Sequence, residues 1–414
     1  MAGVAGTGGG GLGRALAACL LVGGVAAAPL AAPPVSAAQK STAAQGGHAL
    51  RLPARPGGAG TGQKGLSNEP ARPLPESVSE AITAAVAEDM SRLGIPGLSI
   101  ALAEAADLRF AAGYGFADVE NEVEATPDTV YRYASVSKPV TATAALRLSE
   151  QGRLDLDAPV WRYCAAYPPK PWPVSSRQLL CHQGGVRSYA QGERALTRHF
   201  GSVPEGLVVF KDDPLAYEPG TAVQYSTYGY CLLGCAVEGA AGRPFIEVLR
   251  EEVFAPAGMT ATAVDDPRVL VPHRASGYVR TESGDLVNSA LADMTYKVPG
   301  GGLCGTAPDV ARFGSALVSG RLVGRATLAA MLTPQKLRNG HVTGFGLGLT
   351  IGARAGRREA WHIGGQERVS TLLYLRPDTG LSIGILSNLE KVQTPLLDLA
   401  RRVADLATAE HPAR

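Results

Sequence analysis

The sequence predicts a mixed α/β (α+β) fold, in which an antiparallel sheet is flanked by helices and carries a helical insertion. Strand-like runs occur early in the chain, at 97–103 and 108–115. Comparable runs return only near the end, at 345–351, 369–375 and 381–386. Helical and irregular patterns dominate the long stretch between them. Strands from the two ends of the chain therefore have to pair in one sheet, with the intervening helices packed beside it.

The flanking elements support this architecture. Residues 78–93 have the apolar periodicity of an amphipathic helix, and 394–407 have the pattern of a closing helix. The sequence Pro-Asp-Thr-Gly at 377–380 is typical of a turn between the last two strands, and Ser-Gly-Asp at 283–285 is typical of a hairpin turn.

The predicted organisation is accordingly a sheet domain built from 76–133 and 341–409, with a mostly helical domain at 134–340 between its two halves. Its 414 residues, of which 45% are hydrophobic and 18% charged, are ample for a large core and more than one compact unit.

Charge excludes some partner classes. The chain has 39 basic and 37 acidic residues; five of the basic residues and none of the acidic ones lie in 1–68, which leaves 34 against 37 in the remainder. The remainder therefore has a net charge of −3. This balance does not favour nucleic acid or an anionic membrane surface as a partner.

The first residues have the composition of a targeting segment and a tether. Arg14 precedes an apolar stretch at 15–30 that is too rich in Gly, Ala and Pro for a good membrane span, and small residues suited to signal peptidase follow at 35–37. We expect a signal peptide at 1–37, a flexible linker at 38–75, and export to the periplasm or the extracellular space.

Two alternatives concern this segment. It is acid-free and contains arginines, which leaves a mitochondrial transit peptide as the second interpretation. Cys19 ends a short match to a lipoprotein box, but no apolar region precedes it, which disfavours lipidation.

The most informative motif is Ser135-Val136-Ser137-Lys138. Residues three apart share a helix face, so the motif places a hydroxyl beside an amine. Serine needs an adjacent base to become a nucleophile, and a desolvated lysine is one of the few groups that can serve. Ser135 is therefore the candidate nucleophile and Lys138 its candidate base.

A four-residue pattern also has an ordinary interpretation, in which Ser135 caps a helix and Lys138 is solvated. Two observations disfavour it: no other serine in the chain lies three residues before a lysine, and an apolar helical run follows the motif until Gly152.

Two further motifs follow along the chain: Tyr225-Ser226-Thr227, and then His362-Ile363-Gly364-Gly365. Together with Ser135 and Lys138 they resemble the serine β-lactamase and penicillin-binding-protein superfamily, whose members carry S-x-x-K, a Tyr motif and a Lys/His-x-Gly strand. The segments 152–160, 179–185 and 301–303 are similar to the class C branch. The resemblance covers about 76–405 and implies the β-lactamase/transpeptidase-like fold.

A narrower resemblance is to the serine β-lactamase-like proteins of animal mitochondria and their bacterial relatives, on 113–121, 210–215 and 296–297. Thr227 stands where true β-lactamases have Asn, and a hydroxyl cannot offer the donor and acceptor pair of an amide. His362 stands where those enzymes have Lys, so its charge depends on pH. Acyl transfer is expected, but efficient β-lactam turnover is not.

The resemblance also implies the role of each residue. Ser135 attacks a carbonyl, while Lys138 and Tyr225 between them accept its proton and return one to the leaving group. Backbone N–H groups of Ser135 and Gly365 form the oxyanion hole, and Thr227, His362 and Gly364 complete the substrate-binding side. Either Lys138, with a pKa lowered by burial, or an ionised Tyr225 can be the base.

The implied function is a serine hydrolase that forms an acyl-enzyme with a small-molecule or peptide substrate at an amide, peptide or ester bond. The alternative is a catalytically silent binding or structural protein with the same fold.

Other motifs predict no additional chemistry. The glycine runs at 300–302 and 344–348 lack the spacing of nucleotide-binding loops, and no His/Cys/acid cluster has metal-ligand spacing, so no cofactor and no metal are expected. His182 is expected to be structural. Beyond the leader, five cysteines form an odd set without a C-x-x-C pair, and free thiols in the core are expected for them: Cys164, Cys181, Cys231, Cys235 and Cys304.

Overall fold

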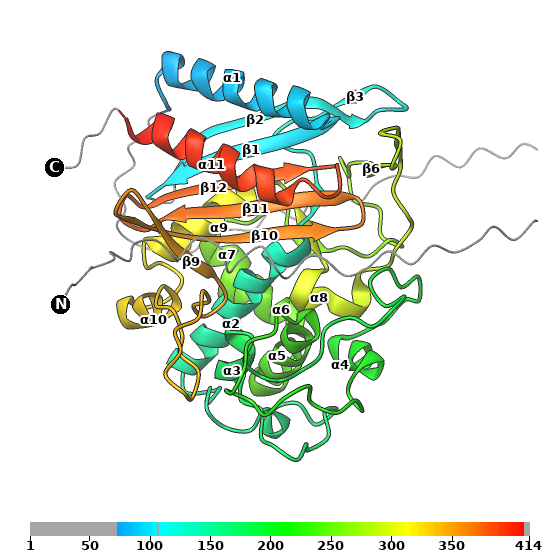
Figure 1. Cartoon of the computed structure of the whole chain (residues 1–414), viewed down its shortest axis with the longest axis vertical. Helices are drawn as coiled ribbons and strands as arrows, with labels where there is room; N and C mark the ends of the chain where they lie inside the picture. Colours follow the sequence, from blue (N-terminus) through cyan, green and yellow to red (C-terminus); the bar gives the residue numbers. More distant parts are fainter. Residues whose placement is uncertain (1–72, 106, 410–414) are drawn as a thin grey trace, which may run out of the picture. The chain divides into compact units, whose positions relative to one another are not determined.

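The structure, a computed structural model, describes residues 73–105 and 107–409. The expected signal peptide at 1–37, Cys19 and positions 38–72 of the expected linker lie outside the described residues. In the part that is described, no helix is both long enough and apolar enough to span a membrane. Figure 1 shows a central sheet with two helices on one side and the other helices on the opposite side.

Seven strands of the described chain form the main sheet, in the order β3-β2-β1-β12-β11-β10-β9, and all neighbours are antiparallel. The strands are β1 Gly97–Glu104, β2 Asp107–Asp118, β3 Val123–Glu124, β9 Thr350–Arg354, β10 Arg357–Gln366, β11 Val369–Arg376 and β12 Leu381–Ser387. The N-terminal and C-terminal groups of strands meet at the β1–β12 pair, where Ile100 lies opposite Ile385. Every residue of β11 and β12 is buried, because helices cover both faces of the sheet.

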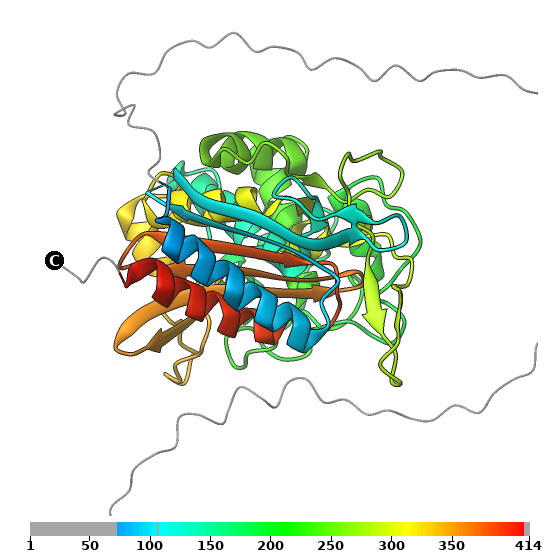
Figure 2. The ribbon, with the colours of Figure 1, turned by 90° about the horizontal axis from the view of Figure 1, so that it is seen from above.

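Helices α1 (Glu76–Leu93) and α11 (Gln393–Thr408) cover one face of the sheet and lie side by side, as Figure 2 shows from above. Their buried side chains include Ile82, Val86, Leu396, Leu399 and Val403. Full burial of such a side chain stabilises the fold by about 1.5–3 kcal/mol. The apolar stripe that predicts each helix from the sequence is thus the face that packs against the sheet.

The middle of the chain supplies the remaining elements. The helical ones are η1 Ala134–Val136, α2 Ser137–Glu150, η2 Val160–Arg162, α3 Ser176–Leu180, α4 Val203–Gly206, η3 Leu207–Val209, α5 Thr227–Ala241, α6 Phe245–Leu249, η4 Arg250–Phe254, α7 Ala255–Ala257, η5 Thr295–Lys297, α8 Val298–Gly301, α9 Ala307–Val318 and α10 Arg325–Met331. Short strands β4 Tyr131–Arg132, β8 Leu303–Gly305 and β5 Ala263–Val264 form a small sheet, and β6 Tyr278–Arg280 pairs with β7 Leu286–Asn288 in the predicted hairpin.

Helix α9 covers the second face of the main sheet. It packs so closely on β12 that a β-carbon at Gly314 would lie 2.1 Å from the hydroxyl of Ser382. Its N-cap, Thr306, accepts a hydrogen bond from the Asp309 N–H at 3.3 Å, as a cap followed three residues later by an acid predicts.

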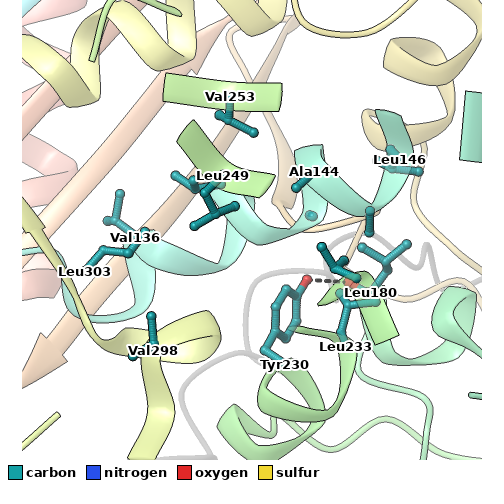
Figure 3. Close-up of a cluster of buried hydrophobic side chains, with 14 of the residues drawn as sticks. Val136, Ala144, Leu146, Leu180, Tyr230, Leu233, Leu249, Val253, Val298 and Leu303 are labelled. Carbon is teal, nitrogen blue, oxygen red and sulfur yellow. Dashed lines mark hydrogen bonds between the residues drawn. The ribbon is translucent and has the colours of Figure 1, made fainter. Parts of the chain in front are cut away.

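Helix α2 lies inside the helical region and is buried along nearly its whole length. Figure 3 shows part of the cluster around it, where Val136, Leu249 and Val253 come from three different elements. In the same cluster the Tyr230 hydroxyl donates a hydrogen bond to the Leu180 carbonyl at 2.7 Å. The element that carries the Ser-x-x-Lys motif is therefore held rigidly from all sides.

Two strand expectations need correction. The strand expected at 345–351 begins at Thr350 instead, because Gly346 and Gly348 bend the preceding segment: Gly348 has φ 91°, and a β-carbon at Gly346 would lie 1.9 Å from the Met331 carbonyl. Strand β10, which carries His362 and the two glycines after it, was not among the strand-like runs found in the sequence, although the family resemblance implies a strand at this motif. Gly-Gly lowers β propensity, which conceals this strand in the sequence.

The expectation of free cysteines is wrong for one pair. Cys164 and Cys235 form a disulfide that links the segment after η2 to helix α5 across 71 positions. Cys181, Cys231 and Cys304 are free and buried, as expected. The two bonded cysteines lie too far apart in the sequence for their spacing to indicate a pair.

This disulfide gives a stability prediction. Cross-linking a loop of this length lowers the entropy of the unfolded chain, so the C164A/C235A double variant should lose roughly 2–4 kcal/mol in free energy of unfolding. Denaturant unfolding under oxidising conditions measures the difference. Cys304 is a buried free thiol, so C304A is the matched control. A reductant should lower the free energy of unfolding of C304A as much as that of the wild type. It should leave the free energy of unfolding of the double variant unchanged. A double variant that is still destabilised by reductant would contradict the assignment.

Candidate active site

Ser135 lies in a tight turn between β4 and α2. The preceding Ala134 has φ 48°, a left-handed conformation that is uncommon for a residue with a side chain. The turn is held by Tyr133, whose N–H donates to the Leu303 carbonyl at 2.7 Å and whose carbonyl accepts from the Thr371 hydroxyl at 2.8 Å. Ser135 remains partly exposed whereas its neighbours are buried. The turn therefore presents one hydroxyl at the surface of a rigid core.

Lys138 lies one turn further along, and its amine is fully buried. Nζ donates to Ser135 Oγ at 3.0 Å, to Thr227 Oγ1 at 3.2 Å and to the Gly300 carbonyl at 2.6 Å. All three partners are uncharged. Burial therefore holds the pKa of Lys138 well below its usual value, and the charge of nearby Lys297 lowers it further. This environment favours the neutral amine, which can accept a proton from Ser135.

Tyr225 lies immediately before the N-cap of α5, and its phenol lies near enough to the Ser135 hydroxyl for that hydroxyl to lower the pKa of the phenol. Its ring centroid is 4.8 Å from Lys138 Nζ, so hydroxyl, amine and phenol converge at one place. The side chain stays 38% exposed, yet burial raises the pKa of the phenol above its ordinary value, and the Ser135 hydroxyl only partly opposes this. The phenol is therefore protonated at neutral pH.

His182 positions Tyr225. The two rings lie 4.4 Å apart, and His182 Nδ1 accepts a hydrogen bond from the Ser226 N–H at 3.3 Å. Burial, together with the charge of Lys138, lowers the pKa of His182, which keeps the ring neutral and able to accept. The structural role expected for this histidine thus includes direct support of the phenol.

Thr227 begins α5 and is only 5% exposed. Its hydroxyl accepts from Lys138 and is also hydrogen-bonded to Tyr189. A β-carbon at Gly300 would lie 2.7 Å from Thr227, so only glycine allows the Gly300 carbonyl to approach this close. The sequence-predicted Thr227 therefore contacts the lysine, and Gly300, which the sequence did not single out as a partner, completes the amine's environment.

Strand β10 brings His362 and the two glycines to the same place. A β-carbon at Gly364 would lie 2.8 Å from the Tyr133 carbonyl, so the glycine permits β10 to lie directly against the turn that holds Ser135. The carbonyl of Gly365 accepts a hydrogen bond from Arg194 at 3.2 Å. Gly364 thus permits close backbone approach beside the nucleophile, whereas a β-carbon at Gly365 would meet the side chain of Gln393.

The His362 ring lies 6.2 Å from the Tyr225 ring and is 5% exposed. Its Nδ1 lies 2.9 Å from the Ile363 carbonyl, which can accept only if Nδ1 carries the proton. Burial lowers the pKa of His362 to about 3, with the charge of Lys138 adding to the effect. His362 is therefore a neutral imidazole at physiological pH.

A second buried lysine, Lys297, was not among the sequence-predicted site residues. Its amine donates to the Arg194 carbonyl at 3.3 Å and lies 5.2 Å from the Tyr189 ring. Burial lowers the pKa of Lys297 to about 8, while the charge of Glu367 opposes the shift. A lysine in a Tyr-Lys dipeptide carries no sequence signal of burial, so this group could be found only from the fold.

Across 73–105 and 107–409, no three His, Cys, Asp or Glu side chains are placed so that they could hold a metal ion.

Similarity to known proteins covers most of the described chain. The Beta-lactamase family model matches residues 82–408. The chain is 30% identical over 301 residues to the human mitochondrial serine beta-lactamase-like protein LACTB, a match that covers 56% of this chain and 55% of that protein. It is 27% identical over 329 residues to penicillin-binding protein 4* of Bacillus subtilis (strain 168), covering 76% and 71%. The chain thus spans little more than half of its human relative.

Among solved structures, the D-amino acid amidase of Ochrobactrum anthropi SV3, in complex with L-phenylalanine amide, has a TM-score of 0.70 at 23% identity. The match covers 81% of this chain and all of the amidase chain. The fold is therefore of the β-lactamase/transpeptidase type.

The low pKa of His362 predicts a pH effect on stability. The unfolded histidine takes up a proton as pH falls below about 6.5, whereas the folded one resists until about pH 3, so protonation favours the unfolded chain in this window. The free energy of unfolding of the wild type should therefore fall about 1.4 kcal/mol per pH unit faster than that of H362Q between pH 6 and 4. Denaturant titrations at several pH values measure this, and parallel curves would contradict it.

Proposed function

The chain belongs to the beta-lactamase family, and from this premise we propose that it is a serine hydrolase that cleaves amide or ester bonds through an acyl-enzyme. The observation that supports this most directly is the buried Lys138 amine 3.0 Å from Ser135 Oγ. Structural residues seldom place an ammonium in a dry environment without a carboxylate partner, because the desolvation is costly. A neutral amine beside a partly exposed hydroxyl is the arrangement that nucleophilic catalysis requires.

Acylation is assigned to the three converging side chains of a class C-like Ser-Lys-Tyr site. Ser135 Oγ attacks the substrate carbonyl and its proton moves to the Lys138 amine. Tyr225, as a neutral phenol, donates a proton to the leaving group and recovers one from Lys138. The raised pKa of the phenol and the lowered pKa of the amine support this division of labour. Water then reverses the steps on the acyl-enzyme.

Stabilisation of the oxyanion is assigned to the backbone N–H groups of Ser135 and Gly365. The close packing that Gly364 permits between β10 and the Tyr133 turn supports this pairing. Removing one such donor typically costs about 10²–10³ in rate.

Recognition in this site is proposed to depend on hydrogen bonds more than on a fixed charge. His362 is neutral where true β-lactamases carry a lysine, and its Nε2 is an acceptor when Nδ1 holds the proton. Thr227 is occupied by Lys138 and cannot act as the amide of an Asn. Both features favour simple peptide, amide or ester substrates over β-lactam antibiotics.

The proposed location is outside the cytoplasm. The Cys164–Cys235 disulfide supports an oxidising compartment, and the penicillin-binding relatives from Bacillus subtilis agree with export. The mitochondrial relatives keep the mitochondrion as the alternative.

Labelling tests the enzyme against its silent alternative. A fluorophosphonate should add once to the wild-type protein, and S135A should show no adduct by intact mass. S91A is the matched control, because Ser91 is an exposed serine on helix α1 and its loss should leave labelling intact. Absence of any adduct with fluorophosphonate and with labelled penicillin would favour a binding protein instead.

The pH dependence of turnover tests which residue is the base. With Lys138 as base, kcat/KM rises as pH increases through the lowered pKa of the lysine and then reaches a plateau. Y225F should keep that midpoint and lose about 10²-fold in rate at the plateau. Y163F, which removes a hydroxyl that accepts a bond from the Asp155 N–H, is the control and should match wild type. A rate that climbs beyond pH 10 and loses its pH dependence in Y225F would assign the base to the phenol.

A further inference from the structure

A cavity separate from the nucleophile is lined by Tyr131 and Arg132 of β4, the strand that precedes the turn with Ser135. Its volume is about 280 Å³, and it is enclosed by β4, by the segments 265–276 and 291–293, and by the β10–β11 turn at Arg368. None of Ser135, Lys138 and Tyr225 lines it. The proposed reaction gives this cavity no role.

Three guanidinium groups line this cavity: Arg132, Arg274 and Arg368. Arg132 is 8% exposed, pairs with Asp265 at 2.6 Å and donates to the Ala292 carbonyl at 2.8 Å. Its side chain is thus well satisfied and forms part of the wall.

The other two guanidinium groups are less well satisfied, although Arg274 donates a hydrogen bond to the Asp266 carbonyl at 3.1 Å. Arg274 lies 3.6 Å from Asp265, and its Nε is buried without a hydrogen-bond partner. Within the described chain, no hydrogen bond or close ion pair reaches the Arg368 side chain. Burial lowers the pKa of Arg368, and the charges of Arg132 and Arg274 act in the same direction. Positive charge is therefore concentrated and only partly compensated.

The acids of the lining do not balance this charge. Asp265 is shared between Arg132 and Arg274. Asp293 is occupied by the Thr295 hydroxyl at 2.5 Å and by His199 at 3.1 Å. Arg368 is left as a cation that faces the cavity, which is the situation an anionic ligand relieves.

The other walls limit what such an anion can be. Apolar residues line much of the cavity, namely Val130, Pro267, Leu291, Ala292 and Val369. Leu291 is 79% exposed at the rim. Apolar walls around a few placed charges are typical of sites for small organic molecules, and the volume restricts the ligand to a small one.

We propose that this cavity binds a small organic carboxylate, whose anionic group pairs with Arg368 and Arg274 and whose apolar part packs against Leu291 and Val369. A guanidinium forms two parallel hydrogen bonds with a carboxylate, which gives the site its preference. The cavity wall includes Arg132, three residues before Ser135, and the turn that follows β10. The occupant therefore lies next to, but outside, the proposed catalytic groups.

Calorimetry with benzoate as probe tests this on the full chain at constant ionic strength. Benzoate should bind saturably, whereas benzyl alcohol, of the same shape without the charge, should bind at least about tenfold more weakly. R368Q and R274Q should each weaken benzoate binding about tenfold or more, since each removes a charged hydrogen bond. R92Q is the matched control, because Arg92 is an exposed arginine on α1, and should bind as wild type does.

Hydrogen exchange places the ligand. Benzoate should slow backbone exchange in 265–276 and around Arg368, and a thermal melt of each variant confirms that it is folded. The proposal is overturned if benzoate binds wild type no more tightly than benzyl alcohol, or if R368Q and R274Q both bind benzoate as well as R92Q does.

Discussion

The burial of the Lys138 amine is the constraint on which the rest of the site depends. Three uncharged groups surround it: the Ser135 hydroxyl from the preceding turn η1, a hydroxyl at the start of α5, and a carbonyl from α8. Each unit by which the pKa of a lysine falls corresponds to about 1.4 kcal/mol of unfavourable environment. Apolar packing around α2, in the cluster of Figure 3, is the stabilising contribution that offsets this cost.

The same constraint explains why glycines occur where α8 and β10 pack against the residues around Ser135 and Lys138. Gly300 lets a backbone carbonyl reach the amine, and Gly364 lets β10 lie against the turn that holds Ser135. A side chain at either position would push apart elements that must meet. His182 adds a hydrogen bond: its neutral ring accepts from the Ser226 N–H and so holds the backbone beside Tyr225. The proposed chemistry thus uses groups whose protonation states are set by packing.

Local patterns predicted what depends on local physics. The periodicity of 78–93 and 394–407 anticipated α1 and α11 within two residues at each end, and the turn signals anticipated the β6–β7 hairpin and the β11–β12 turn. Ser135 and Lys138 could be paired because three residues separate them on one helix. Tyr225 and His362 were brought in only by family resemblance, since nothing in their own surroundings indicates that they meet Ser135.

What the sequence could not predict depends on long-range contacts. A carbonyl such as that of Gly300 has no signature in the residue type, and the environment of the buried Lys297 includes the Tyr189 ring, which another segment contributes. Cys164 and Cys235 pair because α5 packs beside η2. Strand β10 was concealed because the glycines that allow its close approach also weaken its strand propensity.

Direct titration of the Lys138 amine tests the central claim. In protein labelled with ¹³C at lysine Cε, the Lys138 resonance can be assigned by its loss in K138R and followed from pH 5 to 11. The account predicts a midpoint well below 10.5, the ordinary value for a lysine amine. A Lys138 resonance that remains that of an ammonium up to pH 10 would contradict it.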